Sequence, residues 1–415
     1  MVDRGQGTLV VPPAEGATVA RDGGAPSREL LLGIGGGLLS VIGPLSVTIV
    51  TPAYPMLATV FAAPPSQVAG VATMFFMGFS VTQLVCGLLS DALGRRRVGL
   101  AFLALFVLAS LLTLGAQTIG QMLALRFAQG VGAAVGIATA RALVRDQLTG
   151  LAAARVINLM YLVLGVGPML APLLGSLLAE RLGFRAVFGF LALYGAGLML
   201  FLASLRADAE PPDFDRLRLG PQLRTFGRLL SSRSYMLPAL GIAGVSGALY
   251  GQSALLPHLM MDALAMTPVR FGMAVTTVAV CHVAGSLSAR FWISRIAERR
   301  LLVAAATLIL GASGLFAIAA ISAPSVVGLI GPVALAAFAG SHSYPILVTA
   351  TVADFPRDAG AASALLGFFQ MGAGFLVAAL AGLFPPSAML AALGMGTSLA
   401  VAGAAGLAWA LGGRG

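Results

Sequence analysis

Long apolar runs alternate with short polar segments along almost the whole chain. Each run is about 18–26 residues long, the length that an α-helix needs to cross a hydrocarbon core about 30 Å thick. The runs recur too regularly to form one buried core. The pattern therefore predicts an all-α integral membrane protein with twelve transmembrane helices, at residues 29–53, 68–90, 98–116, 120–140, 156–179, 186–204, 235–257, 269–290, 301–321, 325–350, 359–382 and 386–411.

Polar segments divide these helices into two sets of six. Residues 1–28 contain no apolar run, which predicts a disordered tail. The longest interruption, residues 205–234, separates a six-helix bundle at 29–204 from a second one at 235–411, and residues 412–415 form a short tail. The basic, amphipathic stretch Leu219–Leu230 within it is expected to lie on the anionic inner leaflet.

The turns on the two sides of the membrane differ in their arginine content. One set carries Arg95, Arg96, Arg97, Arg141, Arg145, Arg155, six arginines between Arg206 and Arg233, and Arg290, Arg295, Arg299 and Arg300. The other set carries only Arg181, Arg185 and Arg270. Because positive residues in short loops stay on the cytoplasmic side, we expect both termini in the cytoplasm.

Composition agrees with the helix pattern and narrows the chemistry. The chain is 58% hydrophobic and 10% charged, far from the roughly 25% charged content of soluble domains. The net charge of +10 comes from arginines in turns without interleaved aromatics, which argues against nucleic-acid binding. Cys86 and Cys281 lie in apolar runs, so free thiols are expected, and we find no metal-ligand cluster. The glycine-rich segments 33–37 and 130–136 follow no strand, and we interpret them as helix-packing positions and not as nucleotide loops.

One charged residue, Arg126, is predicted to lie well inside the membrane. A lone arginine there costs about 2.5–3.5 kcal/mol on insertion scales, so it needs a cavity or a partner. Gln129 follows three residues later on the same helical face, and its carbonyl oxygen can accept a hydrogen bond from the guanidinium. We expect Arg126 and Gln129 in a substrate cavity. The alternative is a structural arginine that ties helices together through backbone carbonyls.

Three sequence motifs resemble those of the major facilitator superfamily. The turn Gly87–Arg97 reads Gly-Leu-Leu-Ser-Asp-Ala-Leu-Gly-Arg-Arg-Arg and resembles the signature turn of that superfamily, while Gly285–Arg290 is a degraded copy at the same place in the second half. The stretch 125–132 is similar to its second motif. The stretch 165–175 is similar to its antiporter motif, in which Gly167, Pro168, Pro172 and Gly175 allow close approach and a bend. The alternatives are a generic charged turn and the ordinary enrichment of Gly and Pro in membrane helices.

Two longer stretches, 140–155 and 356–370, resemble the bicyclomycin/chloramphenicol-resistance type of drug:proton antiporter. The superfamily resemblance implies two parallel six-helix repeats with substrate bound between them. It also implies a cytoplasmic latch made of Gly87, Asp91, Gly94, Arg95 and Asp146. In that latch, Asp91 faces the N-terminus of the eleventh helix and Arg95 pairs with Asp146.

The first helix departs from this subfamily. Where the resemblance implies an acidic residue, the chain has Thr48, and no Asp or Glu is predicted deep in any span. Histidine titrates near neutral pH, and we favour His342 over His282 as the proton site because Ser341, Ser343, Tyr344 and Pro345 surround it. The alternatives are two neutral packing histidines, with uniport, another driving ion, or a carboxylate such as Glu29 or Asp262 at a helix end. Thr48 and Gln252 complete the expected cavity.

These observations predict a non-enzymatic secondary transporter of a bacterial inner membrane. It is expected to export drugs or other small, largely apolar organic molecules by proton antiport, as a monomer in contact with lipid, using the proton-motive force and no cofactor. A narrow exporter of a metabolite or siderophore, a solute symporter and a uniporter are the alternatives within transport. An intramembrane enzyme and a receptor on an inactive transporter fold are the competitors from other classes.

Overall fold

The computed structural model describes residues 26–148, 150–205, 213–214, 219–322, 324–384 and 387–412, and this part of the chain contains helices and no strand. The helices are α1 (Pro26–Thr48), α2 (Tyr54–Val60), α3 (Pro65–Leu93), α4 (Arg95–Thr113), α5 (Ile119–Ala133), α6 (Gly136–Gln147), α7 (Gly150–Leu182), α8 (Phe184–Ser204), α9 (Leu219–Ser231), α10 (Arg233–Pro257), α11 (Pro268–Trp292), α12 (Glu298–Ser322), α13 (Val326–Ala353), α14 (Ala359–Leu383), α15 (Ala388–Ala391) and α16 (Thr397–Gly412). Shorter helical turns are η1 (Thr51–Ala53), η3 (His258–Ala263, a π-helix), η4 (Pro356–Asp358) and η5 (Ala392–Gly396, a π-helix).

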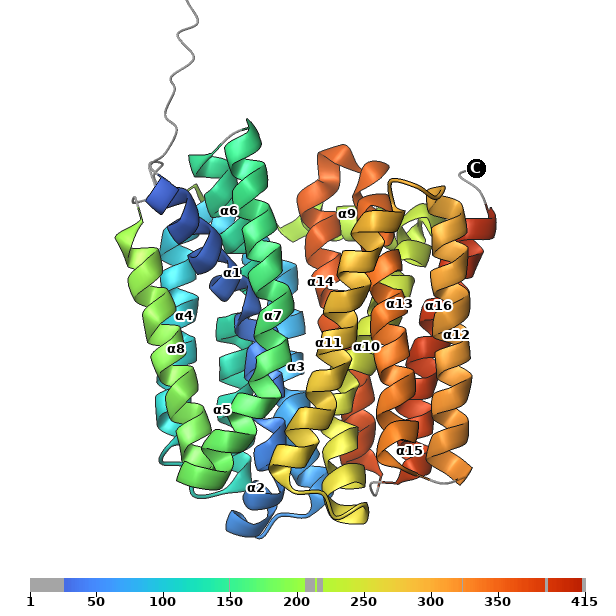
Figure 1. Ribbon diagram of the computed structural model, residues 1–415. Coiled ribbons are helices and arrows are strands. Elements are labelled where there is room, and N and C mark those ends of the chain that lie inside the picture. The colour runs from blue at the N-terminus through green and yellow to red at the C-terminus, as the bar shows by residue number, and fades with distance from the viewer. Residues whose placement is uncertain are drawn as a thin grey trace, which may run out of the picture.

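The predicted all-α membrane fold is confirmed. Within the described ranges, ten helical segments are long and apolar enough to cross a membrane. The segment α5–α6 and helix α7 run alongside them in the same bundle (Figure 1), which accounts for the twelve predicted spans. Most of the predicted tail lies outside the described residues, but α1 already begins at Pro26, before the predicted start at 29.

Three helix predictions need correction. The first predicted helix is interrupted after Thr48, and the chain continues through η1 and α2 to Val60. The fourth is divided into α5 and α6 by a turn at residues 134–135. The seventh does not end at Pro257, since η3 extends the span to Ala263 with a bond from the Leu264 N–H to the Leu259 carbonyl, five residues back. Proline marks a helix boundary only when the following residues cannot continue helical bonding, and here they do.

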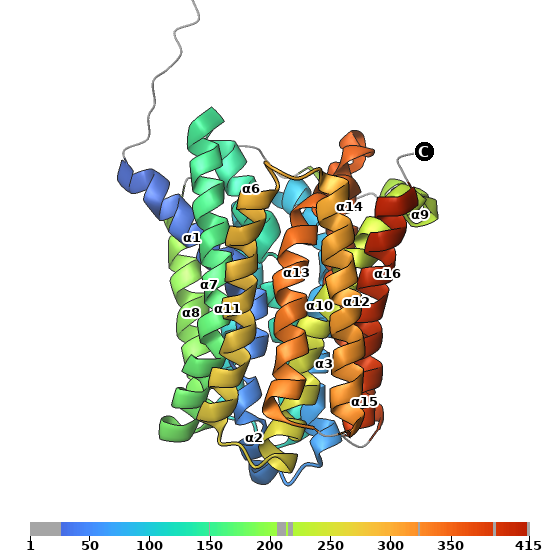
Figure 2. The ribbon, with the colours of Figure 1, turned by 45° about the vertical axis from the view of Figure 1, so that its right-hand side comes forward.

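Two groups of helices lie side by side. In the first half, α1 packs on α7, α3 on α5, and α4 on α5 and α8; in the second half, α11 and α12 pack on α13, and α10 and α12 pack on α16. The halves meet mainly along two helix pairs, α3 with α14 and α7 with α11, with smaller contacts of α10 with α3 and α1 and of α2 with η3. Figure 2 shows α11 between α7 and α13.

Glycines allow the closest of these contacts. A Cβ on Gly78 of α3 would overlap the Phe127 carbonyl oxygen of α5, and a Cβ on Gly130 of α5 would overlap the Phe75 carbonyl oxygen of α3. The two backbones can touch only because neither residue has a side chain. This crossing fixes α5 against α3 at Gly130, next to Gln129 and one turn after Arg126.

The two ends of the bundle are named here by the helices found there. The α9 end holds the start of α1, the amphipathic helix α9 and the end of α16, and the α2 end holds α2 and the start of α11 (Figure 1). Helix α9 covers the predicted amphipathic stretch Leu219–Leu230. Arg181, Arg185 and Arg270, the sparse set of arginines, lie at the α2 end because they end α7 or begin α8 and α11.

Candidate functional site

The break after α1 creates an acceptor inside the first half. The Val50 N–H bonds to the Val47 carbonyl and not to that of Ser46, as an α-helix would require. Pro52 has no N–H for the Thr48 carbonyl, which accepts the Thr51 hydroxyl instead at 2.9 Å. The Ser46 carbonyl is therefore available to a side chain from another helix.

Arg126 uses that acceptor. Its Nη2 donates to the Ser46 carbonyl of α1 at 3.1 Å, its Nε to the Val71 carbonyl of α3 at 3.2 Å, and its Nη1 to Gln129 Oε1 at 2.8 Å. The guanidinium also lies 4.5 Å from the centre of the Phe75 ring. No part of the side chain is exposed. One residue of α5 thus joins three helices of the first half.

The predicted pairing with Gln129 is present and extends further. The Gln129 amide donates from Nε2 to the Ser110 hydroxyl of α4 at 2.8 Å, and that hydroxyl donates to the Phe106 carbonyl. The chain of bonds runs from α1 through α5 to α4. The arrangement is that of the structural alternative, in which an arginine ties helices together through backbone carbonyls, because every acceptor of Arg126 is a carbonyl oxygen of the protein.

The other predicted cavity residues in helices α1 and α10 are buried. The Thr48 hydroxyl donates to the Pro44 carbonyl at 3.0 Å, so it is satisfied within its own helix. Gln252 Nε2 donates to the Leu249 carbonyl at 2.8 Å, while its Oε1 is buried and has no hydrogen-bond partner among the described residues. Gln252 thus has an acceptor free for a ligand, whereas the Thr48 hydroxyl already donates its hydrogen to its own helix.

The histidines of α11 and α13 form two reciprocal pairs with serines. His282 of α11 has its Nδ1 3.0 Å from the Ser341 hydroxyl of α13. His342 of α13 has its Nε2 3.1 Å from the Ser288 hydroxyl of α11, and its Nδ1 3.0 Å from the Phe338 carbonyl. Ser341 therefore does not belong to the surroundings of His342 as predicted, because adjacent residues of a helix point in different directions. Both histidines tie α11 to α13, which is the packing alternative.

Sequence reasoning missed the third histidine, His258. The seventh helix was predicted to end at residue 257, which put His258 in a loop. In the structure His258 is buried in η3, with only 7% of its side chain exposed. Its Nδ1 lies 3.1 Å from Asp262 Oδ2, and its Nε2 is buried without a hydrogen-bond partner in the described part of the chain. The i, i+4 spacing of His258 and Asp262 is the one signal in the sequence that could have revealed the pair.

The antiporter motif lies in α7, where the helix contacts both halves. A Cβ on Gly175 would overlap the Ile49 carbonyl oxygen at the break after α1, and one on Gly167 would lie 2.5 Å from Val41 Cγ1. Pro172 is within α7, and its carbonyl oxygen would lie 3.0 Å from a Cβ on Gly272 of α11. Pro168, one turn earlier, also lacks the N–H of the helical ladder. The motif therefore permits close packing on α1 and α11 together.

The latch residues lie where α3 ends and α4 begins. Gly94 separates the two helices with a φ of 99°, a conformation that favours glycine, and Arg95 is the first residue of α4. A Cβ on Gly87 would meet nothing within 4 Å. The side chains of Asp91 and Asp146 lie outside the described part of the structure, so their predicted pairings remain predictions.

The backbone register nevertheless places position 91 near α14. A Cβ on Gly374 would lie 3.3 Å from the Phe76 ring of α3, and a Cβ on Gly367 would lie 3.2 Å from the Gln83 side chain. The two antiparallel helices keep one register through both contacts. The same register brings Asp91 level with Ala359, the first residue of α14.

Aromatic and uncharged polar side chains occupy the junction between the halves. The Phe76 ring of α3 lies 5.6 Å from the Tyr250 ring of α10, and Gly374 of α14 lies against both residues. Gln370 of α14 donates to the Tyr344 hydroxyl of α13 at 3.3 Å. Ligand pockets for apolar or weakly polar molecules are generally lined by aromatic side chains with a few polar groups.

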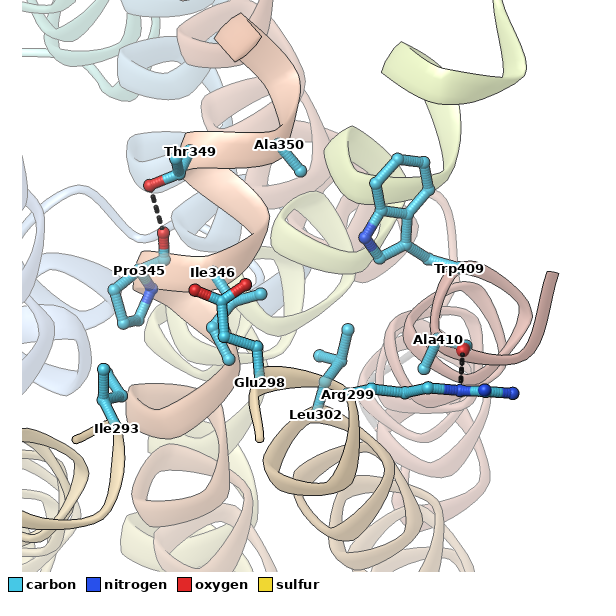
Figure 3. Close-up of a pocket in the computed structure, with 10 residues that line it drawn as sticks. All are labelled: Ile293, Glu298, Arg299, Leu302, Pro345, Ile346, Thr349, Ala350, Trp409 and Ala410. Atoms are coloured by element: carbon cyan, nitrogen blue, oxygen red, sulfur yellow. Dashed lines mark hydrogen bonds between the residues drawn. The ribbon is translucent and has the colours of Figure 1, made fainter. Parts of the chain in front are cut away.

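A separate cavity of about 420 Å³ lies within the second half, among α12, α13 and α16 at the α9 end. Figure 3 shows the Glu298 carboxylate pointing toward Pro345 and Ile346, with the Trp409 ring on the opposite side. Arg299 lies along one edge and donates from Nε to the Ala410 carbonyl at 2.8 Å. None of the predicted site residues lines this cavity, and it lies away from the junction between the halves.

Comparisons with known proteins agree with the arrangement of the helices. The family profile described as "Major Facilitator Superfamily" matches residues 36–379. The chain is 29% identical to "Uncharacterized MFS-type transporter YdgK" of Bacillus subtilis over 84% of this chain and 87% of that protein. It is 29% identical to "Multidrug resistance protein D" of Escherichia coli, again over 84% and 87% of the two chains. The crystal structure of a D-xylose-proton symporter has the same fold, with a TM-score of 0.68 and 15% identity over 93% of this chain and 96% of that one.

Proposed function

The chain belongs to the Major Facilitator Superfamily, a family of multi-pass membrane transporters that move small molecules, and we propose that it exports small, largely apolar organic molecules by proton antiport. Transport proceeds by alternating exposure of a site between the two halves. Membership of this family also answers the question of enzyme or transporter, since the chain is a transporter.

The observation that carries the proposed substrate class is the junction around Phe76 and Tyr250. Aromatic rings from opposite halves meet there, with Gln370 and Tyr344 as nearby uncharged polar groups. A site of this kind buries apolar surface and fixes orientation with a few hydrogen bonds. The name of the Escherichia coli relative, a multidrug resistance protein, supports the same class.

The proposed orientation has the α9 end in the cytoplasm of a bacterial inner membrane. Among the described residues, arginines concentrate at that end, and the α2 end has only Arg181, Arg185 and Arg270. Both termini are then cytoplasmic, and α9 lies at the inner leaflet. We propose a monomer, with lipid around the outer helices and no cofactor.

Drug efflux measurements test this proposal. Cells of a drug-sensitive bacterial host that produce the protein should export ethidium and other lipophilic dyes faster than cells with an empty vector. In sealed vesicles that contain the purified protein, an imposed pH gradient should accelerate that efflux. Dye efflux at a rate that does not depend on the pH gradient would reject proton antiport. If none of a panel of drugs and dyes is exported, a narrow exporter of a metabolite is favoured instead.

A further inference from the structure

We propose that His258 and Asp262 form the proton-binding pair of this transporter. The inference rests on the proposed proton antiport and adds the site at which the coupling proton binds. It replaces His342, the histidine that sequence reasoning favoured. Three features of the structure carry it: a carboxylate partner, a buried unpartnered nitrogen, and a location where the two halves touch.

The pair connects the surface with the interior. Asp262 is 54% exposed at the α2 end, whereas His258 is 7% exposed, and the two side chains meet at 3.1 Å between Oδ2 and Nδ1. One turn of η3 separates the two residues, and π-helical turns are frequent at functional sites. The exposed carboxylate therefore joins the aqueous phase at the α2 end to a buried imidazole.

The buried end of the imidazole faces a contact between the halves. His258 Nε2 has no hydrogen-bond partner in the described structure, and neither does the buried hydroxyl of Tyr54, in the first turn of α2. The two rings are 6.5 Å apart between their centres. Burying a polar atom without a partner costs free energy, so two such atoms on opposite sides of one interface indicate a group that acquires a partner in another state.

His342 lacks these features. Its Nδ1 lies beside the Phe338 carbonyl, which can only accept, and its Nε2 lies beside the Ser288 hydroxyl, which can donate. The neutral imidazole with its hydrogen on Nδ1 is therefore fully satisfied. Among the described residues no carboxylate is bonded to this ring, so no negative charge faces His342 as Asp262 faces His258.

The ionisable groups around His258 favour a single proton site. From its own turn Asp262 contacts it, from α2 Tyr54 lies against it, and Arg270 is exposed in the first turn of α11 at the same end. Tyr250 of α10 packs instead on Phe76. Arg126 is within electrostatic range of Tyr54 and adds a fixed positive charge behind it. The negative charge of Asp262 is thus the group that stabilises an imidazolium at His258.

Protonation changes the contact between the halves. Neutral His258 takes one proton from water at the α2 end, its charge rises from zero to +1, and no covalent bond other than N–H forms. With both nitrogens protonated, Nε2 becomes a donor next to Tyr54, whose hydroxyl can accept. The proton leaves to water when the α9 side opens. Binding and release of the proton thus shift the equilibrium between states in which α2 and η3 touch or separate. Coupling of proton movement to transport requires such a shift.

Spin-label distances measure this bias without any transported substrate. Nitroxides at Thr59→Cys of α2 and Met273→Cys of α11, in a protein without Cys86 and Cys281, report the opening of the α2 end in lipid vesicles. We expect the distance distribution of the otherwise unchanged protein to shift between about pH 5 and pH 8, the range in which histidine changes charge. The variant His258→Gln should not show the shift.

Two further variants distinguish a specific role of the His258–Asp262 pair from a general loss of stability. Asp262→Asn alters an exposed side chain and should move the midpoint of the shift to lower pH, because the imidazolium loses its carboxylate partner. His342→Gln, the matched control in a buried histidine, should keep the wild-type midpoint. In vesicles, His258→Gln should lose pH-gradient-driven ethidium efflux and keep ethidium exchange, which needs no proton.

The outcomes distinguish this inference from the proposed function. If the wild type exports ethidium without responding to a pH gradient, proton antiport is rejected and this inference with it. If the wild type responds and His258→Gln responds equally, only the assignment to His258 and Asp262 is overturned. Loss of the response in His342→Gln alone would also overturn it and return the proton to His342.

Discussion

Replacing Arg126 by alanine removes a side chain that joins α1, α3 and α5. Three hydrogen bonds disappear, to the Ser46 carbonyl, the Val71 carbonyl and Gln129 Oε1. The Ser46 carbonyl is left without a donor because the break after α1 has already withdrawn the Val50 N–H from it. The Arg126→Ala variant should therefore be less stable and should lose most transport.

The size of the stability effect follows from the acceptors left behind. Each buried acceptor without a partner costs about 1–3 kcal/mol, so the Ser46 carbonyl and Gln129 Oε1 together predict about 2–6 kcal/mol. Arg126→Lys should fall between the wild type and alanine, because an ammonium keeps the charge but cannot reproduce the planar fork.

Unfolding by SDS in mixed micelles, followed by tryptophan fluorescence, measures the stability, and dye efflux from vesicles measures transport. Arg155→Ala is the matched control. The Arg155 side chain is 71% exposed and lies 3.7 Å from Glu29, so its loss should cost less than about 1 kcal/mol. Reaction of Cys86 and Cys281 with a thiol reagent before and after unfolding checks that each variant is folded.

Two results would refute the reasoning on Arg126. An alanine variant with wild-type unfolding and wild-type efflux would show that the three bonds contribute nothing. A folded alanine variant with wild-type stability but no transport would show that Arg126 acts on the substrate and not as a tie between helices. Full recovery with lysine would remove the argument from the planar fork.

Three further substitutions test other parts of the molecule. Gly175→Ala should destabilise the protein by about 1–3 kcal/mol, because the new Cβ overlaps the Ile49 carbonyl oxygen, whereas Gly197→Ala meets no atom within 4 Å and should leave the unfolding midpoint unchanged. Asp91→Asn should lower the maximal efflux rate with little change in the dye concentration for half-maximal efflux, if the predicted latch stabilises the state whose cytoplasmic side is closed; a changed half-maximal concentration at an unchanged rate would contradict it. His342→Gln should lower stability slightly and keep gradient-driven efflux, and loss of the gradient response would show that this histidine carries the proton.

Hydrophobic length and charge were sufficient to predict the architecture. Membrane-spanning helices satisfy their own backbone groups, so their existence depends on local composition and not on distant partners. The all-α fold, the twelve spans and the amphipathic helix α9 followed from residues that are neighbours in sequence. The pairing of Arg126 with Gln129 was also predictable, because residues three positions apart on a helix lie on the same face.

Only the tertiary structure decided which atoms meet between helices. The break after α1 frees the Ser46 carbonyl, and the donor that uses it, Arg126, lies in another helix. Ser341 turned toward His282 and not toward its neighbour His342, since rotation of a helix about its axis is set by packing. His258 was buried by the π-helical continuation of its span against Tyr54 from the other half. These contacts join residues far apart in the chain, and apolar periodicity carries no information about them because it records which face is buried and not which neighbour buries it.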